Sequence, residues 1–146
     1  MSTRLFVLVF GVVYIILGVL GFIPALGSAP AASAPHVAVT NNWMDLFGFL
    51  PTNLIENIAY IVLGVFGVLL GATLGTAVGY SRLLFVIFGL ATVAGFMPQA
   101  DTLWGAMPLY SPNTWLHVAT ALVAAYFGWV AQAETYVAPV AGHVSH

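Results

Sequence analysis

A histidine inside an almost wholly apolar stretch is the first candidate for chemistry in this sequence. His117 lies in "PNTWLHVATALVAAYFGW", residues 112–129. A neutral imidazole on such a helix can act as the axial ligand of a haem or a chlorophyll-type pigment, or it can form a hydrogen bond to a neighbouring helix. Ring nitrogens left unpaired in hydrocarbon are costly. We therefore expect His117 to face the other helices, and we favour a hydrogen bond to Asn57 or Tyr60 over ligation.

The polar residues at the predicted helix starts suggest capping rather than catalysis. "NLIE" (53–56) has the capping-box pattern, in which Asn53 caps the helix and Glu56 reaches back to the chain before it. Ser111 precedes Pro112 in the same way, with proline at the first helical position, where its missing N–H costs nothing. We therefore predict capping roles for Asn53, Glu56 and Ser111.

Other reactive groups are sparse. His143 and His146 lie in the last four residues, but a structural zinc site usually takes four ligands at suitable spacing. The chain has no cysteine, which excludes thiolate ligands and disulfides. We find no glycine-rich phosphate loop and no acid–base pair of carboxylates. The expectation is a protein without a metal site that is not an enzyme.

The elements that position these residues are set by composition. Apolar residues make up 62% of the 146 and charged residues only 4%, whereas soluble domains carry about 25% charged residues. Such a chain is expected to be an all-α integral membrane protein with a single domain, residues 1–146. The lack of a basic patch argues against nucleic acid as a partner. Four apolar stretches approach the ~20 residues of a spanning helix, and they cover residues 5–23, 53–74, 83–97 and 112–130.

The two arginines predict the orientation of the chain. Arg4 precedes the first stretch and Arg82 separates the second from the third, so four passes place both on one side. The positive-inside rule makes that side cytoplasmic, with both termini and a flexible tail, 133–146, on it. The long loop on the other side begins with the Pro/Ala/Ser-rich "PALGSAPAASAP" (24–35). It continues with "NNWMDLFG" (41–48), which we predict to be a short interfacial helix.

The chain also looks duplicated. "RLFVLVFGVVYIILGVLGFIP" (4–24) matches "RLLFVIFGLATVAGFMP" (82–98) after deletion of four residues, and "LFGFLP" (46–51) matches "LWGAMP" (103–108). The sequence therefore predicts two tandem two-helix repeats, 4–79 and 82–132. Two passes in each copy would relate them by a pseudo-twofold axis along the membrane normal.

Small residues at helical spacing predict close packing. Glycines recur at every fourth position of the second stretch and small residues line one face of the fourth, a pattern that lets backbones approach. We expect these two faces to pack on each other. The residues are Gly67, Gly71, Gly75 and Gly79, and Ala121, Ala124 and Gly128.

The order of these motifs resembles a known family. "FG…GFIP", then "LFGFLP-N", then "LWGAMP…NTWLH…FG" is similar to the uncharacterised bacterial membrane family labelled domain of unknown function 4383, over about residues 4–130. The resemblance implies a four-helix membrane protein. Histidines commonly open both even-numbered helices in that pattern. Here only His117 does so, and Glu56 and Tyr60 stand at the corresponding place in the second helix.

Three functions fit these features. The first is a non-catalytic accessory or structural subunit that packs against other membrane subunits or against copies of itself. The alternative is a pigment- or haem-associated subunit of an energy-transducing membrane complex, photosynthetic complexes included, with His117 as axial ligand. A small transporter is the third, suggested only by the repeat. All three predict a multi-pass protein of the bacterial inner, or a photosynthetic, membrane.

Overall fold

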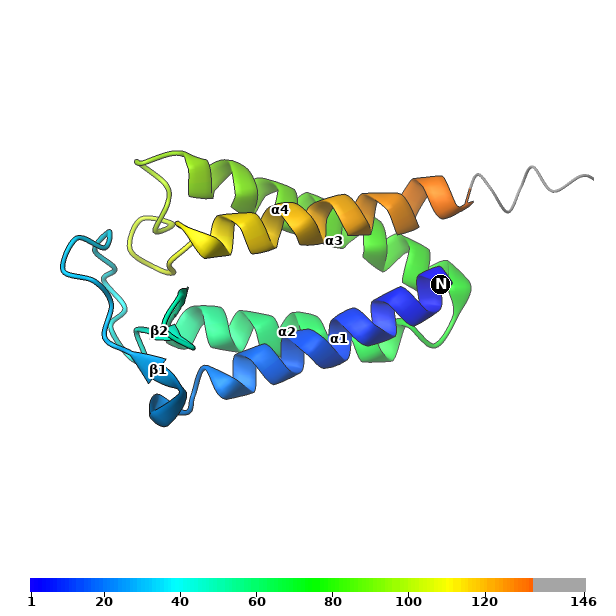
Figure 1. Cartoon of the computed structure of the whole chain (residues 1–146). Helices are drawn as coiled ribbons and strands as arrows, with labels where there is room; N and C mark the ends of the chain where they lie inside the picture. Colours follow the sequence, from blue (N-terminus) through cyan, green and yellow to red (C-terminus); the bar gives the residue numbers. More distant parts are fainter. Residues whose placement is uncertain (133–146) are drawn as a thin grey trace, which may run out of the picture.

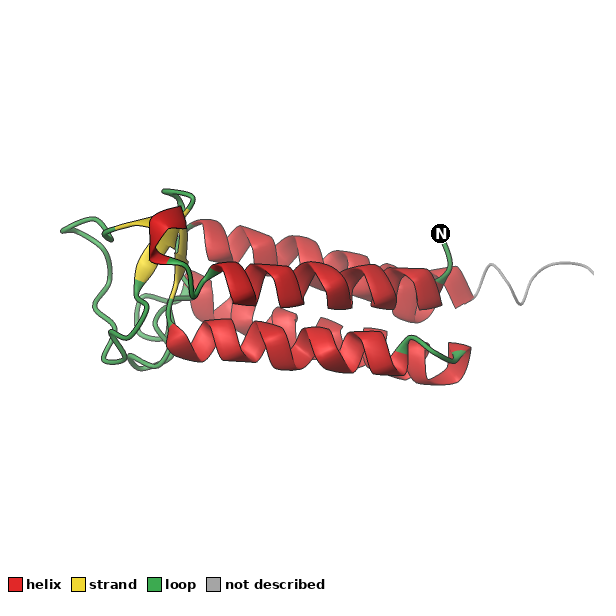
Figure 2. Ribbon diagram, turned by 90° about the horizontal axis from the view of Figure 1, so that it is seen from below, coloured by secondary structure: helices red, strands yellow, loops and turns green. Residues whose placement is uncertain are grey.

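The computed structural model describes residues 1–132 and shows a bundle of four helices (Figures 1 and 2). The helices are α1 (Thr3–Leu20), α2 (Leu54–Leu70), α3 (Leu74–Phe96) and α4 (Pro112–Ala125), and α4 continues into a π-helical turn, η2 (Tyr126–Val130). Successive helices run in opposite directions, and α1 packs chiefly on α2 and α3 on α4. The short α2–α3 turn lies beside the N-terminus, and the longer connections gather at the other end, called the loop end below.

Helix α3 begins nine residues before the predicted start at residue 83, and with 23 residues it is the longest helix of the described chain. The prediction was wrong because glycine, threonine and Arg82 lower the hydropathy of residues 74–82. The helix nevertheless forms there because its polar groups find partners. Thr73 caps its first turn by accepting a hydrogen bond from the Thr76 amide at 3.3 Å. The Ser81 hydroxyl donates to the Ala124 carbonyl at 2.9 Å.

The loop between α1 and α2 contains a small sheet that the all-helical expectation did not include. A short 3₁₀ turn, η1 (Pro24–Leu26), is followed by β1 (Gly27–Ser28), β2 (Met44–Leu46) and β3 (Leu50–Thr52). The strands pair antiparallel in the order β1-β2-β3. The helix predicted at 41–48 is therefore wrong. Met44 and Leu46 are buried while Asp45 between them is half-buried, which is the two-residue alternation of a strand.

Two turns of the same geometry lie at the loop end, one in each half of the chain. Phe47 and Gly48 have φ angles of 56° and 80°, and Trp104 and Gly105 have 54° and 91°. The residue after each pair closes the turn by donating its amide to the carbonyl three residues earlier, at 3.3 Å and 3.2 Å. Positive φ at both central positions defines a type I′ turn, for which glycine at the second position is well suited.

A cluster of aromatic rings joins the two helix pairs. Phe10 of α1 stacks on Tyr14 at 4.3 Å between centroids and meets the edges of Phe88 and Tyr80 of α3 at 5.9 and 6.4 Å. Phe6 stacks on Phe127 of η2 at 4.7 Å. All these rings are buried, so they form the apolar core between α1, α3 and η2.

The glycine face of α2 packs on α1, not on α4 as predicted. A Cβ atom added to Gly67 would lie 3.0 Å from the backbone of both Gly11 and Val7, and one added to Gly71 would lie 2.8 Å from the Leu8 side chain. Gly64 and Gly11 lie still closer, because a Cβ on either would approach the carbonyl oxygen of the other to 2.5–2.6 Å. The closest backbone contact of the bundle is therefore α1 against α2.

The remaining small residues also have other partners than predicted. Gly75 and Gly79 belong to α3, and a Cβ at either would meet nothing within 4 Å. On α4 and η2, Ala121, Ala124 and Gly128 are buried. Gly128 lies against Arg82 of α3. The predicted packing of these two small-residue faces on each other is thus replaced by two separate contacts, α1–α2 and α3–α4.

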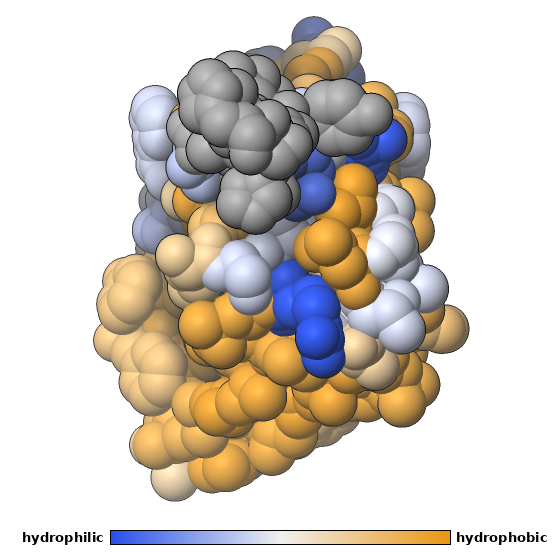
Figure 3. Space-filling model, turned by 90° about the vertical axis from the view of Figure 1, so that its right-hand side faces the viewer, coloured by the Kyte–Doolittle hydropathy of each residue, from blue (hydrophilic) through white to orange (hydrophobic). Residues whose placement is uncertain are grey.

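The outward faces of the helices are apolar. Two helices, α1 and α3, are long and apolar enough to cross a membrane, and α2 is a shorter apolar helix. Exposed leucine, isoleucine, valine and phenylalanine side chains occur along all of them. Viewed onto the end where the N-terminus lies, hydrophilic residues are surrounded by broad apolar areas (Figure 3).

Candidate functional site

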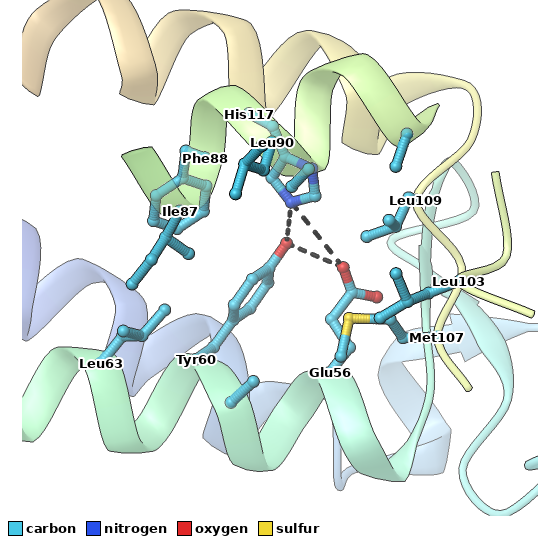
Figure 4. Close-up of a pocket in the computed structure, with 13 residues that line it drawn as sticks. Glu56, Tyr60, Leu63, Ile87, Phe88, Leu90, Leu103, Met107, Leu109 and His117 are labelled. Atoms are coloured by element: carbon cyan, nitrogen blue, oxygen red, sulfur yellow. Dashed lines mark hydrogen bonds and ion pairs between the residues drawn. The ribbon is translucent and has the colours of Figure 1, made fainter. Parts of the chain in front are cut away.

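Four polar side chains from α2 and α4 meet inside the bundle near its loop end. Glu56 and Tyr60 lie one turn apart on α2, and Asn113 and His117 lie one turn apart on α4. A spacing of four residues places each pair on one helix face. All four are buried, with Glu56 only 1% exposed and His117 only 2%. Figure 4 shows Glu56 and Tyr60 pointing across the bundle toward His117.

The Tyr60 hydroxyl is the centre of a short hydrogen-bonded chain. It donates to Glu56 Oε1 at 2.9 Å and lies 3.1 Å from His117 Nε2. With the phenol hydrogen directed at Glu56, the phenol oxygen can accept a hydrogen bond from Nε2. The carboxylate and Nε2 are 4.0 Å apart. The other ring nitrogen, Nδ1, is buried without a hydrogen-bond partner.

Asn113 links this chain to both loops at the end of the bundle. Its amide nitrogen lies 2.9 and 3.1 Å from the two Glu56 oxygens. It also lies 2.6 Å from the carbonyls of Pro51 and Pro108, one from each half of the chain. Two amide hydrogens are thus shared among the acceptors of three segments, while the amide oxygen has no partner. This position holds the two halves in register around Glu56.

The charges around Glu56 are unusual for a buried carboxyl group. The chain has two basic residues, both arginine, and both lie at the opposite end of the bundle. Arg4 donates to the Gly71 carbonyl at 3.3 Å and Arg82 to the Gly128 carbonyl at 2.9 Å. Glu56 therefore has hydrogen-bond donors around it but no arginine or lysine. In the loops that cover this end, burial raises the pKa of Asp45 and of Tyr110 above their usual values.

A cavity of about 350 Å³ adjoins the cluster, and Glu56, Tyr60 and His117 are among the residues that line it. Its walls are otherwise apolar and come from α2, α3 and the loop before α4 (Figure 4). They are formed by Ala59, Leu63, Ile87, Phe88, Leu90, Ala91, Ala94, Leu103, Met107 and Leu109. Leu90 is 67% exposed, so the cavity is a cleft that reaches the surface of the bundle at this residue of α3.

A second polar pair lies one turn deeper. The hydroxyl groups of Tyr14 and Thr120 are 2.6 Å apart, and the Tyr14 ring meets the Tyr60 ring edge-on at 4.9 Å between centroids. Asn113, His117 and Thr120 thus form one inward polar face of α4. Asn113, Tyr14 and Thr120 were not among the predicted site residues, although the helical spacing of the polar positions on α4 indicated a shared face.

Of the two partners expected for His117, the structure pairs it with Tyr60. Asn57 makes its hydrogen bonds to other residues. The Asn57 amide donates to the Gly21 carbonyl at 2.8 Å and accepts from the Thr52 hydroxyl. Asn57 therefore anchors the end of α1, because its position on α2 faces α1 and not α4.

The predicted caps have different outcomes. Asn53 is the N-cap of α2, and its side-chain oxygen accepts from the Glu56 amide at 3.1 Å. The capping role of the Glu56 side chain is wrong, because its carboxylate faces the bundle and accepts from Tyr60 and Asn113. Ser111 occupies the N-cap position of α4 and Pro112 the first helical position, as predicted, but Ser111 has φ 57° and its side chain makes no cap bond.

Within residues 1–132, no group of three or more His, Cys, Asp or Glu side chains could hold a metal ion. His143 and His146 lie outside the described residues. What the cluster offers is a carboxyl group, a phenol and an imidazole in the lining of an apolar cleft, an arrangement suited to hydrogen-bonding or charge pairing with the polar end of a small molecule.

The comparisons with known proteins return one family. A family model described as Domain of unknown function (DUF4383) matches residues 4–130. No curated protein and no solved structure matches the chain.

Proposed function

The chain belongs to the DUF4383 family, and from this premise we propose that it is a non-catalytic integral membrane protein that binds a small lipophilic molecule. The observation that carries the proposal is the cleft lined by α2 and α3, which has almost wholly apolar walls, includes Glu56, Tyr60 and His117 in its lining, and reaches the exposed Leu90. A volume of about 350 Å³ is within the range of small-molecule sites. A molecule dissolved in the bilayer would enter such a cleft without crossing water.

Four membrane passes are supported by the lengths and surfaces of the helices. At ~1.5 Å per residue, the 17 residues of α2 span about 26 Å, close to the ~30 Å of a hydrocarbon core. Large apolar side chains are exposed along the outward faces, which suits lipid rather than water. Arg4 and Arg82 share one end of the bundle. We propose that this end is cytoplasmic and that the protein is multi-pass in a bacterial inner or photosynthetic membrane.

The proposed duplication is supported by matching details in the two halves. Both have the type I′ turn described above, at Phe47–Gly48 and at Trp104–Gly105. Both begin with an arginine that donates to a glycine carbonyl of the next helix in the same half. Two independent correspondences at opposite ends of the bundle favour repeats over residues 4–79 and 82–132.

The pigment alternative fits this geometry less well. His117 Nε2 is occupied by the Tyr60 hydroxyl at 3.1 Å, so axial ligation through Nε2 requires that contact to break. Its Nδ1 is enclosed within the bundle. A carboxyl group within 4.0 Å favours binding of a polar or charged headgroup over ligation of a large flat macrocycle.

A second candidate function, an accessory subunit, is favoured by a different surface. Gly75 and Gly79 lie one turn apart on α3 with open space beside them. Glycines at this spacing let the helix of another membrane subunit, or of a second copy, approach closely. This role is compatible with ligand binding because the glycines do not line the cleft.

The test uses variants that close the cleft or leave it open. Ala91→Phe places a ring in the cleft, and Val93→Phe places the same ring on the exposed face of the same helix. Protein extracted in mild detergent is washed, its lipophilic molecules are identified by mass spectrometry, and binding of a neutral pyrene alcohol is titrated. Wild type and Val93→Phe should bind and Ala91→Phe should not. Equal binding by all three proteins, or none by wild type, would contradict the proposal.

A further inference from the structure

The charge pattern of the cleft indicates the chemical class of its ligand. We infer that the cleft takes a lipophilic cation, that is, an amine or quaternary ammonium group carried on an apolar body. The inference rests on the proposed function, since it requires that the cleft is a binding site, and it goes further by stating which headgroup is recognised.

Glu56 has no arginine or lysine near it to balance a negative charge. The carboxyl group accepts hydrogen bonds from Tyr60 and Asn113, but both basic residues of the chain lie at the far end of the bundle. An ionised carboxylate removed from water needs a positive partner to offset its lost hydration. Within the protein only a proton or the His117 ring can provide that charge. A ligand cation bound in the cleft beside Glu56 would provide it directly.

Three rings line the cleft together with Glu56. They are those of Tyr60, Phe88 and His117. The Phe88 and His117 centroids are 5.3 Å apart, and those of Tyr60 and His117 are 6.4 Å apart. Aromatic faces attract cations, and groups of aromatic rings recognise quaternary ammonium ligands.

The lining of the cleft disfavours both anionic lipids and small hydrophilic cations. Phosphate and carboxylate headgroups would meet the Glu56 oxygens with no arginine or lysine to neutralise them, so anionic lipids are poor ligands. Small hydrophilic ammonium ions lack the apolar surface that would fill the walls near Leu63 and Ile87. Apolar burial stabilises a complex by about 25 cal/mol per Å², so the walls select a cation with an attached apolar group.

The experiment compares three probes that share one tail. Pyrenebutyl-trimethylammonium, pyrenebutanol and pyrenebutyrate are titrated against the full chain in lipid nanodiscs, and protein-free nanodiscs are subtracted. The ammonium probe should bind about tenfold more tightly than the alcohol, and the butyrate should bind more weakly than either. Glu56→Gln should bring the ammonium affinity to that of the alcohol, and the matched control Asp101→Asn, outside the cleft, should leave all three affinities unchanged.

The outcomes separate the two proposals. If the alcohol binds as tightly as the ammonium probe to wild type, the cation inference is wrong and the binding function stands. If none of the three probes binds, the proposed function is wrong as well. If Glu56→Gln leaves the ammonium affinity at the wild-type value, Glu56 is not the recognising group and the inference fails.

A measurement on unaltered protein covers the case in which Glu56→Gln does not fold. Dicyclohexylcarbodiimide is apolar and enters from the bilayer. The carboxyl O–H adds across one of its C=N bonds, and the O-acylisourea rearranges to an N-acylurea, so the protein gains the whole reagent and nothing leaves. Mass spectrometry of peptides should place the label on Glu56, and the ammonium probe should slow labelling about tenfold at saturation. Labelling that the ammonium probe does not slow would overturn the inference.

Discussion

Replacing Gly64 by alanine should destabilise the bundle through a single methyl group. The added Cβ would lie 2.5 Å from the Gly11 carbonyl oxygen and 2.7 Å from the Ile15 amide nitrogen. Both are backbone atoms of α1, so they cannot move aside as a side chain can. To reach the 3.4 Å of an ordinary contact, the two helices must separate along most of their length. Overpacking of this kind costs about 1–3 kcal/mol.

Gly79→Ala is the matched control, because it makes the same chemical change where nothing lies within 4 Å. Alanine is favoured over glycine in a helix by up to ~1 kcal/mol, and both variants gain this term. The difference between their free energies of unfolding therefore isolates the steric cost, about 2 kcal/mol. Reversible unfolding by dodecyl sulfate titration in mixed micelles, followed by circular dichroism on monomeric fractions, measures it. If Gly64→Ala is as stable as Gly79→Ala, the close α1–α2 contact is wrong.

Three further predictions concern the polar cluster and the orientation. Asn113→Ala should lower the free energy of unfolding by about 2–4 kcal/mol, since bonds to a charged acceptor contribute ~1.5–3 and neutral ones ~0.5–1.5; a loss below ~1 in the same titration would contradict its linking role. His117→Leu should cost only about 0.6 kcal/mol, the mean for an interhelical polar bond, because Tyr60 keeps its bond to Glu56; a loss above ~2 would reveal a larger role for the ring. A cysteine at Ser33 should react with an impermeant maleimide in intact cells, and one at Gly75 only after lysis, while the reverse pattern would invert the proposed orientation.

Much of the helical framework was predictable because it depends on local sequence. Long apolar stretches located all four helices, and Asn53 marked the start of α2 by its capping chemistry. The positive φ values of Gly48 and Gly105 fit the two similar hexapeptides that contain them. The start of α3 was not predictable from hydropathy, because its first turns are stabilised by partners such as the Ala124 carbonyl, which are distant in the sequence.

The candidate site was also only partly predictable from local sequence. The polar residues of α4 occur at helical spacing, so their common face follows from sequence alone. Their partners do not, because Tyr60 and His117 are 57 residues apart and either Tyr60 or Asn57 satisfied the local pattern. For Glu56 the local capping signal was misleading. The same tetrapeptide starts the helix whether its carboxylate turns outward or into the bundle.

The sequence by itself therefore determined the apolar composition and the approximate positions of the four helices, since these follow from short-range hydrogen bonding and from the average polarity of each segment. Only the tertiary structure decided which helix faces meet. A glycine stripe shows that some backbone comes close, but it does not identify which one. Here the contact of α2 with α1 sets the rotation of α2, and that rotation turns Glu56 and Tyr60 toward His117 and opens the cleft. Helix rotation depends on contacts with the whole bundle, and so no local stretch of sequence encodes it.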